Sequence, residues 1–206
     1  MKIAVPITSN MEESLKDMET AYEAGADIVE LRIDSIADIN LEKLIFYSSL
    51  PVIATNRVKS EGGNFNGSEG QRIMLLEEAV NLGANYVDLE LNYLPENFDK
   101  RASKLIVSYH NFAETPENLD EIYKKICDKN ADIVKIATKA NNEFDVDRMI
   151  DLIEYSKKDI IGICMGELGK RTRLHPKNYL TFACLPGKES APGQMTLEEL
   201  KGRLWT

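Results

Sequence analysis

A lysine in the middle of an apolar stretch is the residue of this sequence with the clearest capacity for chemistry. Residues 132–137 read Asp-Ile-Val-Lys-Ile-Ala, which is typical of a strand buried on both faces in a parallel sheet. Burial without a partner disfavours the charged form of a lysine, so Lys135 would there be an amine nucleophile. An equally good interpretation of this stretch alone places Lys135 at the strand end, with its ammonium in solvent.

A histidine is the second candidate for chemistry. His110 is one of two histidines and ends an apolar stretch, residues 104–110, one strand before Lys135. Because imidazole titrates near neutral pH, a histidine here suits general acid–base catalysis. A lone histidine is more often structural, and we expect the other one, His175 in a polar loop, to be an ordinary surface residue.

The composition limits the partners of the chain. Its 206 residues include 25 basic and 34 acidic ones, and the net charge of −9 argues against a nucleic-acid or anionic-membrane partner. No stretch reaches the roughly 20 apolar residues of a membrane-spanning helix, and no targeting segment is visible. Cys127, Cys164 and Cys184 have no metal-like spacing and suggest reduced thiols of a cytoplasmic protein. An anionic ligand would therefore need positive charge gathered locally.

Strand-like and helix-like segments alternate along the whole chain. The expected strands are residues 2–7, 26–33, 51–57, 86–91, 104–110, 132–137, 160–164 and 180–185. The expected helices are residues 10–24, 41–47, 69–82, 115–129 and 144–157, a short turn at 169–175, and a last helix beginning at Thr196. Eight such units, with no Gly-x-Gly-x-x-Gly turn after the first strand, predict a compact (β/α)8 TIM barrel, one domain over residues 1–206. An open parallel sheet is the alternative.

Barrels of this kind build their active sites at the carboxyl ends of the strands. The residues near those ends are Glu30, Arg32, Arg57, Asp88, Glu90, His110, Lys135 and Met165. The period of two along a strand lets Glu30 and Lys135 face the barrel interior. Each of these residues alone could be structural, for example with Asp88 and Glu90 as ion-pair partners of the arginines. This explanation is poor for all of them together, because isolated buried charges cost several kcal/mol each.

The loops after the seventh and eighth strands could form a phosphate site, as they do in many barrels. They carry Arg171, Arg173, Lys188 and Gln194.

Six motifs, in order along nearly the whole chain, resemble the type I 3-dehydroquinate dehydratases of the shikimate pathway. They are VELRID at 29–34, Arg57 with EGG at 61–63, YHNF at 109–112, VKIA at 134–137, MG at 165–166 with TR at 172–173, and SAPGQ at 190–194. Each motif is weak alone, but their order and spacing together are specific.

The resemblance implies a lyase that dehydrates 3-dehydroquinate to 3-dehydroshikimate without cofactor or metal. Lys135 matches the lysine that forms a Schiff base with the C3 ketone, and His110 matches the general acid and base. Glu61 matches the acid that orients this histidine, and Arg173 matches the residue that holds the substrate carboxylate. The other substrate-binding matches are Glu30, Arg32, Arg57, Met165, Ser190 and Gln194.

The resemblance also implies a homodimer. The N-terminal hairpin of longer members has no counterpart here, because the first strand begins at residue 2, and what covers the barrel floor is left open. Two other functions are alternatives: a class I aldolase that forms a Schiff base with a sugar phosphate, and a non-catalytic protein that binds polyol acids. The first needs a phosphate site in the last two loops, and the presence of both Lys135 and His110 argues against the second.

Overall fold

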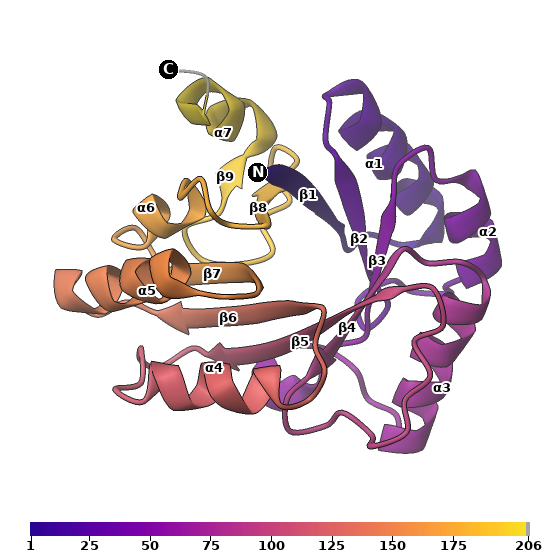
Figure 1. Ribbon diagram of the computed structural model, residues 1–206. Helices are drawn as coiled ribbons and strands as arrows, with labels where there is room; N and C mark the ends of the chain where they lie inside the picture. The colour runs from indigo at the N-terminus through magenta and orange to yellow at the C-terminus, as the bar shows by residue number, and fades with distance from the viewer. Residues whose placement is uncertain (205–206) are drawn as a thin grey trace.

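Nine parallel strands form one continuous sheet in the computed structural model, which describes residues 1–204 (Figure 1). The strands are β1 (Lys2–Ile7), β2 (Ile28–Arg32), β3 (Val52–Thr55), β4 (Tyr86–Glu90), β5 (Lys104–Asn111), β6 (Ile133–Lys139), β7 (Asp159–Met165), β8 (Leu180–Cys184) and β9 (Met195–Thr196). Their order in the sheet is β7-β6-β5-β4-β3-β2-β1-β8-β9. All eight expected strands are present, and the short β9 was not expected.

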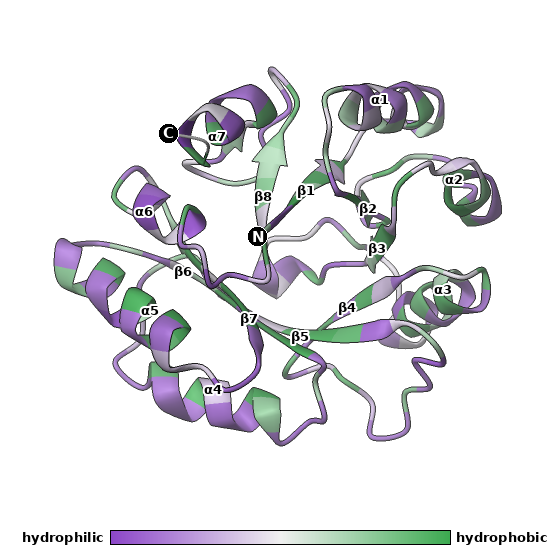
Figure 2. Cartoon of the chain, turned by 45° about the horizontal axis from the view of Figure 1, so that its top comes forward, coloured by the Kyte–Doolittle hydropathy of each residue, from purple (hydrophilic) through white to green (hydrophobic). Residues whose placement is uncertain are grey.

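The helices lie outside the curved sheet and turn their polar residues outward (Figure 2). They are α1 (Met11–Glu23), α2 (Leu41–Tyr47), the short 3-10 helix η1 (Lys59–Glu61), α3 (Glu69–Asn81), α4 (Leu119–Cys127), α5 (Glu143–Tyr155), α6 (Lys170–Arg173) and α7 (Leu197–Leu204). No helix among residues 1–204 combines the length and the apolar character needed to cross a membrane.

The sheet curls until the edge strand β7 comes beside the start of β8, which gives the predicted TIM-barrel-like fold. A single parallel bridge, Ile160 with Asn178, joins the two segments there. The side-chain amide of Asn178 takes the place of a strand peptide: its oxygen accepts the Gly162 N–H at 2.7 Å, and its nitrogen donates to the Gly162 carbonyl at 3.2 Å. Further along β8, β9 pairs with the strand through Ala183 and Met195.

The barrel interior is filled by an apolar layer that lies directly beneath a charged one. Ile28 of β2 and Ile133 of β6 belong to the buried interior cluster. Because side chains on one face of a strand repeat every two residues, Glu30 and Lys135 point into the same interior, one layer nearer the carboxyl ends. This stacking confirms that the alternation predicted from the sequence directs both charges inward.

Two tyrosines and two lysines cover the floor of the barrel. The hydroxyls of Tyr86 and Tyr179 lie 3.0 Å apart, and Lys2 Nζ donates to both at 3.2 and 3.3 Å. Lys104 Nζ donates to Tyr179 at 3.3 Å. All four side chains stand at or beside the first residues of strands, so they close the end opposite the charged layer.

One predicted helix start is wrong. The sequence Thr115-Pro116-Glu117 suggested a capped helix beginning there, but α4 begins at Leu119 after Asn118. The Thr115 hydroxyl is buried and donates to the carbonyl of Lys139 at 2.9 Å, which ties this segment to β6. The side chain of Thr115 is thus turned toward β6, and the N-cap position of α4 is taken by Asn118 instead.

Candidate active site

All ten residues predicted for the site line one pocket at the carboxyl ends of the strands. They are Glu30, Arg32, Arg57, Glu61, His110, Lys135, Met165, Arg173, Ser190 and Gln194. With its open mouth included, the pocket contains about 640 Å³ of space outside the protein atoms. Phe112 and Phe182, which the sequence argument did not assign to the site, add two aromatic walls.

Lys135 is buried inside the barrel. Its side chain is 7% exposed, and its Nζ lies 2.7 Å from Asp88 Oδ2 and 3.6 Å from Glu30 Oε1. The ammonium also lies 4.6 Å from the centre of the Phe182 ring. The alternative interpretation, a lysine at a strand end that reaches solvent, is therefore wrong, and the Nζ atom instead faces the pocket.

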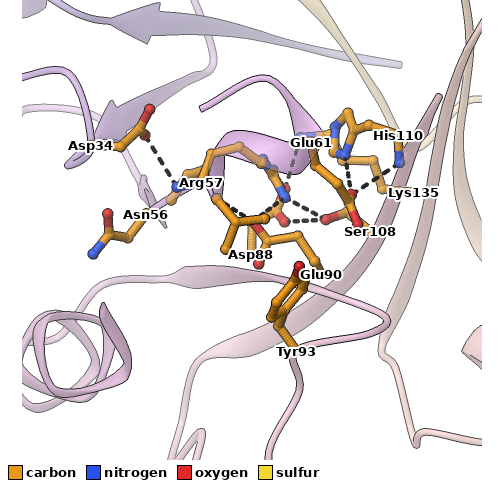
Figure 3. A network of polar contacts seen from close by, with 12 residues as sticks. Asp34, Asn56, Arg57, Glu61, Asp88, Glu90, Tyr93, Ser108, His110 and Lys135 are labelled. Atoms are coloured by element: carbon orange, nitrogen blue, oxygen red, sulfur yellow. Dashed lines mark hydrogen bonds and ion pairs between the residues drawn. The ribbon is translucent and has the colours of Figure 1, made fainter. Parts of the chain in front are cut away.

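A network of arginines and carboxylates lies beneath this lysine (Figure 3). Arg57 contacts Asp88 Oδ2 at 2.8 Å and Glu90 Oε1 at 3.2 Å, and Arg72 contacts Glu90 Oε2 at 2.8 Å. Asp88 and Glu90 are thus ion-pair partners of arginines, as the structural alternative proposed. Arg72, fully buried in α3, was missed because a lone arginine in a helix usually lies on its solvated face.

His110 and Glu61 form a pair at the edge of the pocket. Glu61 Oε2 accepts the backbone N–H of His110 at 3.0 Å and lies 2.9 Å from its Nδ1. With the proton on Nδ1 donated to Glu61, Nε2 keeps a free lone pair and can accept a proton from a ligand. Gly62 follows with a φ of 80°, and a Cβ atom there would collide with the ring of Phe112.

Burial shifts the pKa values of both His110 and Glu61. It lowers the pKa of His110 well below its usual value, and the positive charges of Arg57 and Lys135 act in the same direction. The imidazole is therefore neutral near pH 7. Burial also raises the pKa of Glu61 to about 7, against the opposing charge of Arg57.

The pKa of Glu61 predicts an acid limb in the rate profile. Above about pH 7 the carboxylate accepts the Nδ1 proton, whereas below it the protonated carboxyl donates to Nδ1 and moves the histidine proton to Nε2. We expect kcat/KM to fall as the pH decreases through about 7. In Glu61→Gln this step should disappear, with activity roughly 10- to 100-fold lower throughout. Steady-state rates from pH 5 to 9 test this, and an unchanged acid limb in the variant would assign it to another group.

Arg173 is a buried cation without an acidic partner among residues 1–204. It is 2% exposed, its Nη2 donates to the carbonyl of Pro192 at 3.4 Å, and its Nε has no partner among the described residues. Burial lowers its pKa to about 10, so it remains charged at neutral pH. Since a buried charge without a counterion is costly, the guanidinium is suited to an anionic ligand. Arg57, expected to share this task, already pairs with two carboxylates.

The loop before β9 folds over the mouth of the pocket. Gln194 Oε1 accepts from the Ser190 backbone N–H at 2.7 Å and from the Ser190 hydroxyl at 3.0 Å. Gly166, at the end of β7, donates its N–H to the Pro192 carbonyl at 3.2 Å. Gly193 has a φ of 71°, and a Cβ there would overlap the Gly166 backbone, so the loop and the strand approach closely.

The predicted phosphate site is not assembled. Arg171 pairs with Glu143 at 3.2 Å, and Lys188 pairs with Asp17 at 2.6 Å, so neighbouring helices neutralise both cations. Of the four residues predicted there, Arg173 and Gln194 line the pocket. His175, expected to be an ordinary surface residue, is partly buried, and its Nε2 lies 3.0 Å from Oε1 of the half-exposed Glu154.

Asp34 connects three parts of the site, a role that the sequence argument did not assign to it. Its carboxylate binds Arg32 at 2.8 and 3.0 Å and accepts the backbone N–H groups of Arg57 at 3.2 Å and Asn64 at 3.0 Å. The ends of β2 and β3 and the loop after η1 are thereby joined. Within residues 1–204, no three His, Cys, Asp or Glu side chains are grouped so that they could hold a metal ion.

The fold and the pocket together define a class: a barrel enzyme with a buried lysine on an inner strand beside a histidine–carboxylate pair. The family model for type I 3-dehydroquinase matches residues 3–205, and the chain belongs to this family. The family inferred from the six sequence motifs is therefore confirmed.

Known relatives agree with this assignment. The chain is 39% identical to the 3-dehydroquinate dehydratase of Methanothermobacter thermautotrophicus, over 96% of this chain and 93% of that one. It is also 39% identical to a bifunctional 3-dehydroquinate dehydratase/shikimate dehydrogenase of Arabidopsis thaliana, over 96% of this chain and 36% of that longer protein. The solved type I 3-dehydroquinate dehydratase of Clostridium difficile, with covalently modified comenic acid, superposes with a TM-score of 0.87 at 29% identity, covering 98% and 90% of the two chains.

Proposed function

We propose that this chain dehydrates 3-dehydroquinate to 3-dehydroshikimate through an imine on Lys135. One observation carries the proposal: the pocket of a type I 3-dehydroquinase family member holds a buried lysine, a histidine–carboxylate pair and an arginine with no acidic partner in the described part of the chain. These supply a nucleophile, a base and an anion site for a substrate that is a ketone and a carboxylate. The chemistry needs no cofactor or metal ion.

In the first stage, Lys135 Nζ attacks the C3 carbonyl carbon of the substrate. The ketone oxygen leaves as water, and it takes with it two protons that began on the ammonium. The product is an iminium, which withdraws electrons from C2 and makes its C–H bond acidic.

In the second stage, His110 Nε2 removes the C2 proton and the electrons move into the iminium, which becomes a neutral enamine. The enamine then expels the C1 hydroxyl, to which His110 returns the proton, so that water leaves and the iminium is restored. Glu61 holds Nδ1 during both transfers, and this keeps Nε2 directed at the substrate. Hydrolysis of the imine releases the product and regenerates Lys135.

Trapping of the imine tests the proposal. The protein is mixed with 3-dehydroquinate and borohydride, and the mass of the peptide that carries Lys135 is measured while turnover is followed in parallel. We expect a reduced substrate adduct on that peptide. An adduct formed only with a sugar phosphate would support the aldolase alternative, which the ion pairs of Arg171 and Lys188 disfavour. Binding without any adduct would support the non-catalytic alternative.

Replacement of Arg173 should weaken substrate binding strongly. The Arg173→Ala variant loses the charge that would pair with the substrate carboxylate in a buried site, so we expect KM to rise by about 10²-fold or more. The carboxylate is carried by C1, the carbon that loses its hydroxyl, so misplacement of this group should lower kcat as well. Arg171→Ala is the matched control, since that arginine lies two residues away and faces Glu143. A KM equal to that of the wild type in Arg173→Ala would contradict the assignment.

The wider setting is part of the same proposal. We take residues 1–206 as one barrel domain that works in the cytoplasm as a homodimer. The free thiols of Cys127, Cys164 and Cys184 support a reducing compartment, and the family resemblance supports the dimer. Light scattering after size-exclusion chromatography measures the oligomeric state.

A further inference from the structure

Asp88 is the closest acidic neighbour of the reacting nitrogen, and the mechanism above gives it no role. It stands on β4 with a side chain that is fully buried. Its Oδ2 lies 2.7 Å from Lys135 Nζ and 2.8 Å from Arg57 Nη2, and its Oδ1 accepts the Ser108 hydroxyl at 2.6 Å (Figure 3). Glu30 is more distant from Nζ, at 3.6 Å, and its Oε1 already accepts the Thr55 hydroxyl.

Ser108 fixes the orientation of this carboxylate. It lies on β5 beside Lys135 in the ladder to β6, and its hydroxyl is buried. The hydroxyl donates to Asp88 Oδ1 and accepts from Arg57 Nη1, both at 2.6 Å. Since both oxygens of Asp88 are engaged, the carboxylate cannot rotate without breaking a buried hydrogen bond.

The charge on the lysine nitrogen explains why such a partner is useful. An ammonium and a ketone react to give an iminium and water, so the nitrogen is positive before and after the imine forms. A carboxylate already in place can pair with both species without reorganisation. Burial raises the pKa of Asp88, but the charges of Arg57 and Lys135 outweigh burial and hold it well below its usual range. Asp88 is therefore an anion throughout.

Arg57 shares the same carboxylate oxygen, and this limits the strength of the pair. When the C2 proton leaves, the iminium becomes a neutral enamine. If Asp88 had no other cation beside it, its negative charge would stabilise the iminium and oppose that step. The guanidinium, 2.8 Å from Oδ2, offsets part of the charge. With Arg57 beside it, Asp88 still pairs with the positive nitrogen of Lys135. The pair is weak enough for that nitrogen to become neutral in the enamine.

We propose that Asp88 is a further catalytic residue, which directs Lys135 Nζ into the pocket and pairs with the iminium, and that Ser108 is the residue that positions it. This inference rests on the proposed function, because it concerns the same imine. The competing explanation is structural: Asp88 neutralises buried arginines, and Ser108 supports the fold. In that case, substitutions would lower stability without changing the rate at which the imine forms.

The experiment measures the rate of imine formation separately from folding. Protein and 3-dehydroquinate are mixed, the reaction is quenched with borohydride at increasing times, and the adduct is read from the intact mass. Thermal melting of each variant reports its stability. We expect Ser108→Ala to form the adduct roughly 10- to 100-fold more slowly, because a displaced Asp88 misdirects the nitrogen, while KM changes little. Asp88→Asn should slow it by about 10²-fold or more.

Two control variants separate the positioning of Asp88 by the Ser108 hydroxyl from an effect on the stability of the fold. Ser108→Thr keeps the hydroxyl and should recover most of the rate. Ser103→Ala removes another buried serine hydroxyl, which donates to the Ala84 carbonyl at 2.6 Å at the start of β5, so it should lower stability and leave the rate unchanged.

The outcomes distinguish this inference from the proposed function. If the wild type forms no adduct with 3-dehydroquinate, the imine mechanism itself fails. If the wild type forms the adduct and both Ser108→Ala and Asp88→Asn match its rate, the inference is overturned and Asp88 is structural. A slow Ser108→Ala that Ser108→Thr does not restore also overturns the role of the hydroxyl.

Discussion

Replacement of Lys135 by alanine is expected to abolish the borohydride-trapped adduct and to reduce kcat by about 10⁴-fold or more. The loss is large because the residue supplies the covalent bond to the substrate, and no neighbouring group in the pocket can replace an amine at that position. Intact mass after reduction measures the adduct, and a steady-state assay at high enzyme concentration, with substrate still in excess, measures the residual rate.

A second lysine of the same strand serves as the control for this variant. Lys139 is the last residue of β6 and is exposed, so Lys139→Ala should retain both adduct and rate. The loss of Lys135 leaves Asp88 paired with Arg57, which should allow the variant to fold, and circular dichroism checks this. An adduct of undiminished yield in folded Lys135→Ala would place the imine on another lysine and refute the mechanism.

Replacement of His110 by alanine should separate bond formation from proton transfer. The lysine remains, so we expect the adduct to form with 3-dehydroquinate and to accumulate. Turnover should fall by about 10²- to 10⁴-fold, the usual contribution of a positioned general acid or base. Rapid quench with borohydride and a steady-state assay on the same preparation provide both values. The adduct fraction during turnover should be higher than in the wild type, because the steps after imine formation have become slow.

The other histidine of the chain is the matched control. His175 pairs with Glu154 between α5 and β8, and it does not line the pocket, so His175→Ala should keep the wild-type rate. If His110→Ala lost the adduct to the same extent as Lys135→Ala, the division of roles between the two residues would be wrong.

Several features of this molecule could be predicted from local patterns. Strands such as residues 104–110 and 132–137 were found because short apolar stretches end at polar turns, and their period of two places Glu30 and Lys135 on the inner face. The start of the helix expected at residues 10–24 was also found, and there Asn10 accepts the Glu13 N–H at 3.1 Å. The helix expected from Thr115 begins only at Leu119, and the Thr115 side chain is instead bonded to β6, a tertiary contact that no local pattern records.

The sequence motifs identified the candidate residues, whereas the folded structure showed which of them form ion pairs with one another. All ten line one pocket, yet the arginines differ in a way that their types do not reveal. Arg57 is neutralised by Asp88 and Glu90, Arg32 is held by Asp34, and Arg173 lacks an acidic partner among residues 1–204.

The sequence by itself determined the barrel class, the family, and the identity of the lysine and histidine, because apolar period and motif order are properties of the chain alone. Only the tertiary structure decided which charges are paired. Arg57 follows the end of β3, Asp88 lies on β4, and Ser108 and Lys135 lie on β5 and β6. Their contacts therefore depend on strand register and on distances of 2.6 to 2.8 Å. Electrostatic energy depends on such distances and on burial, and both exist only once the barrel has folded.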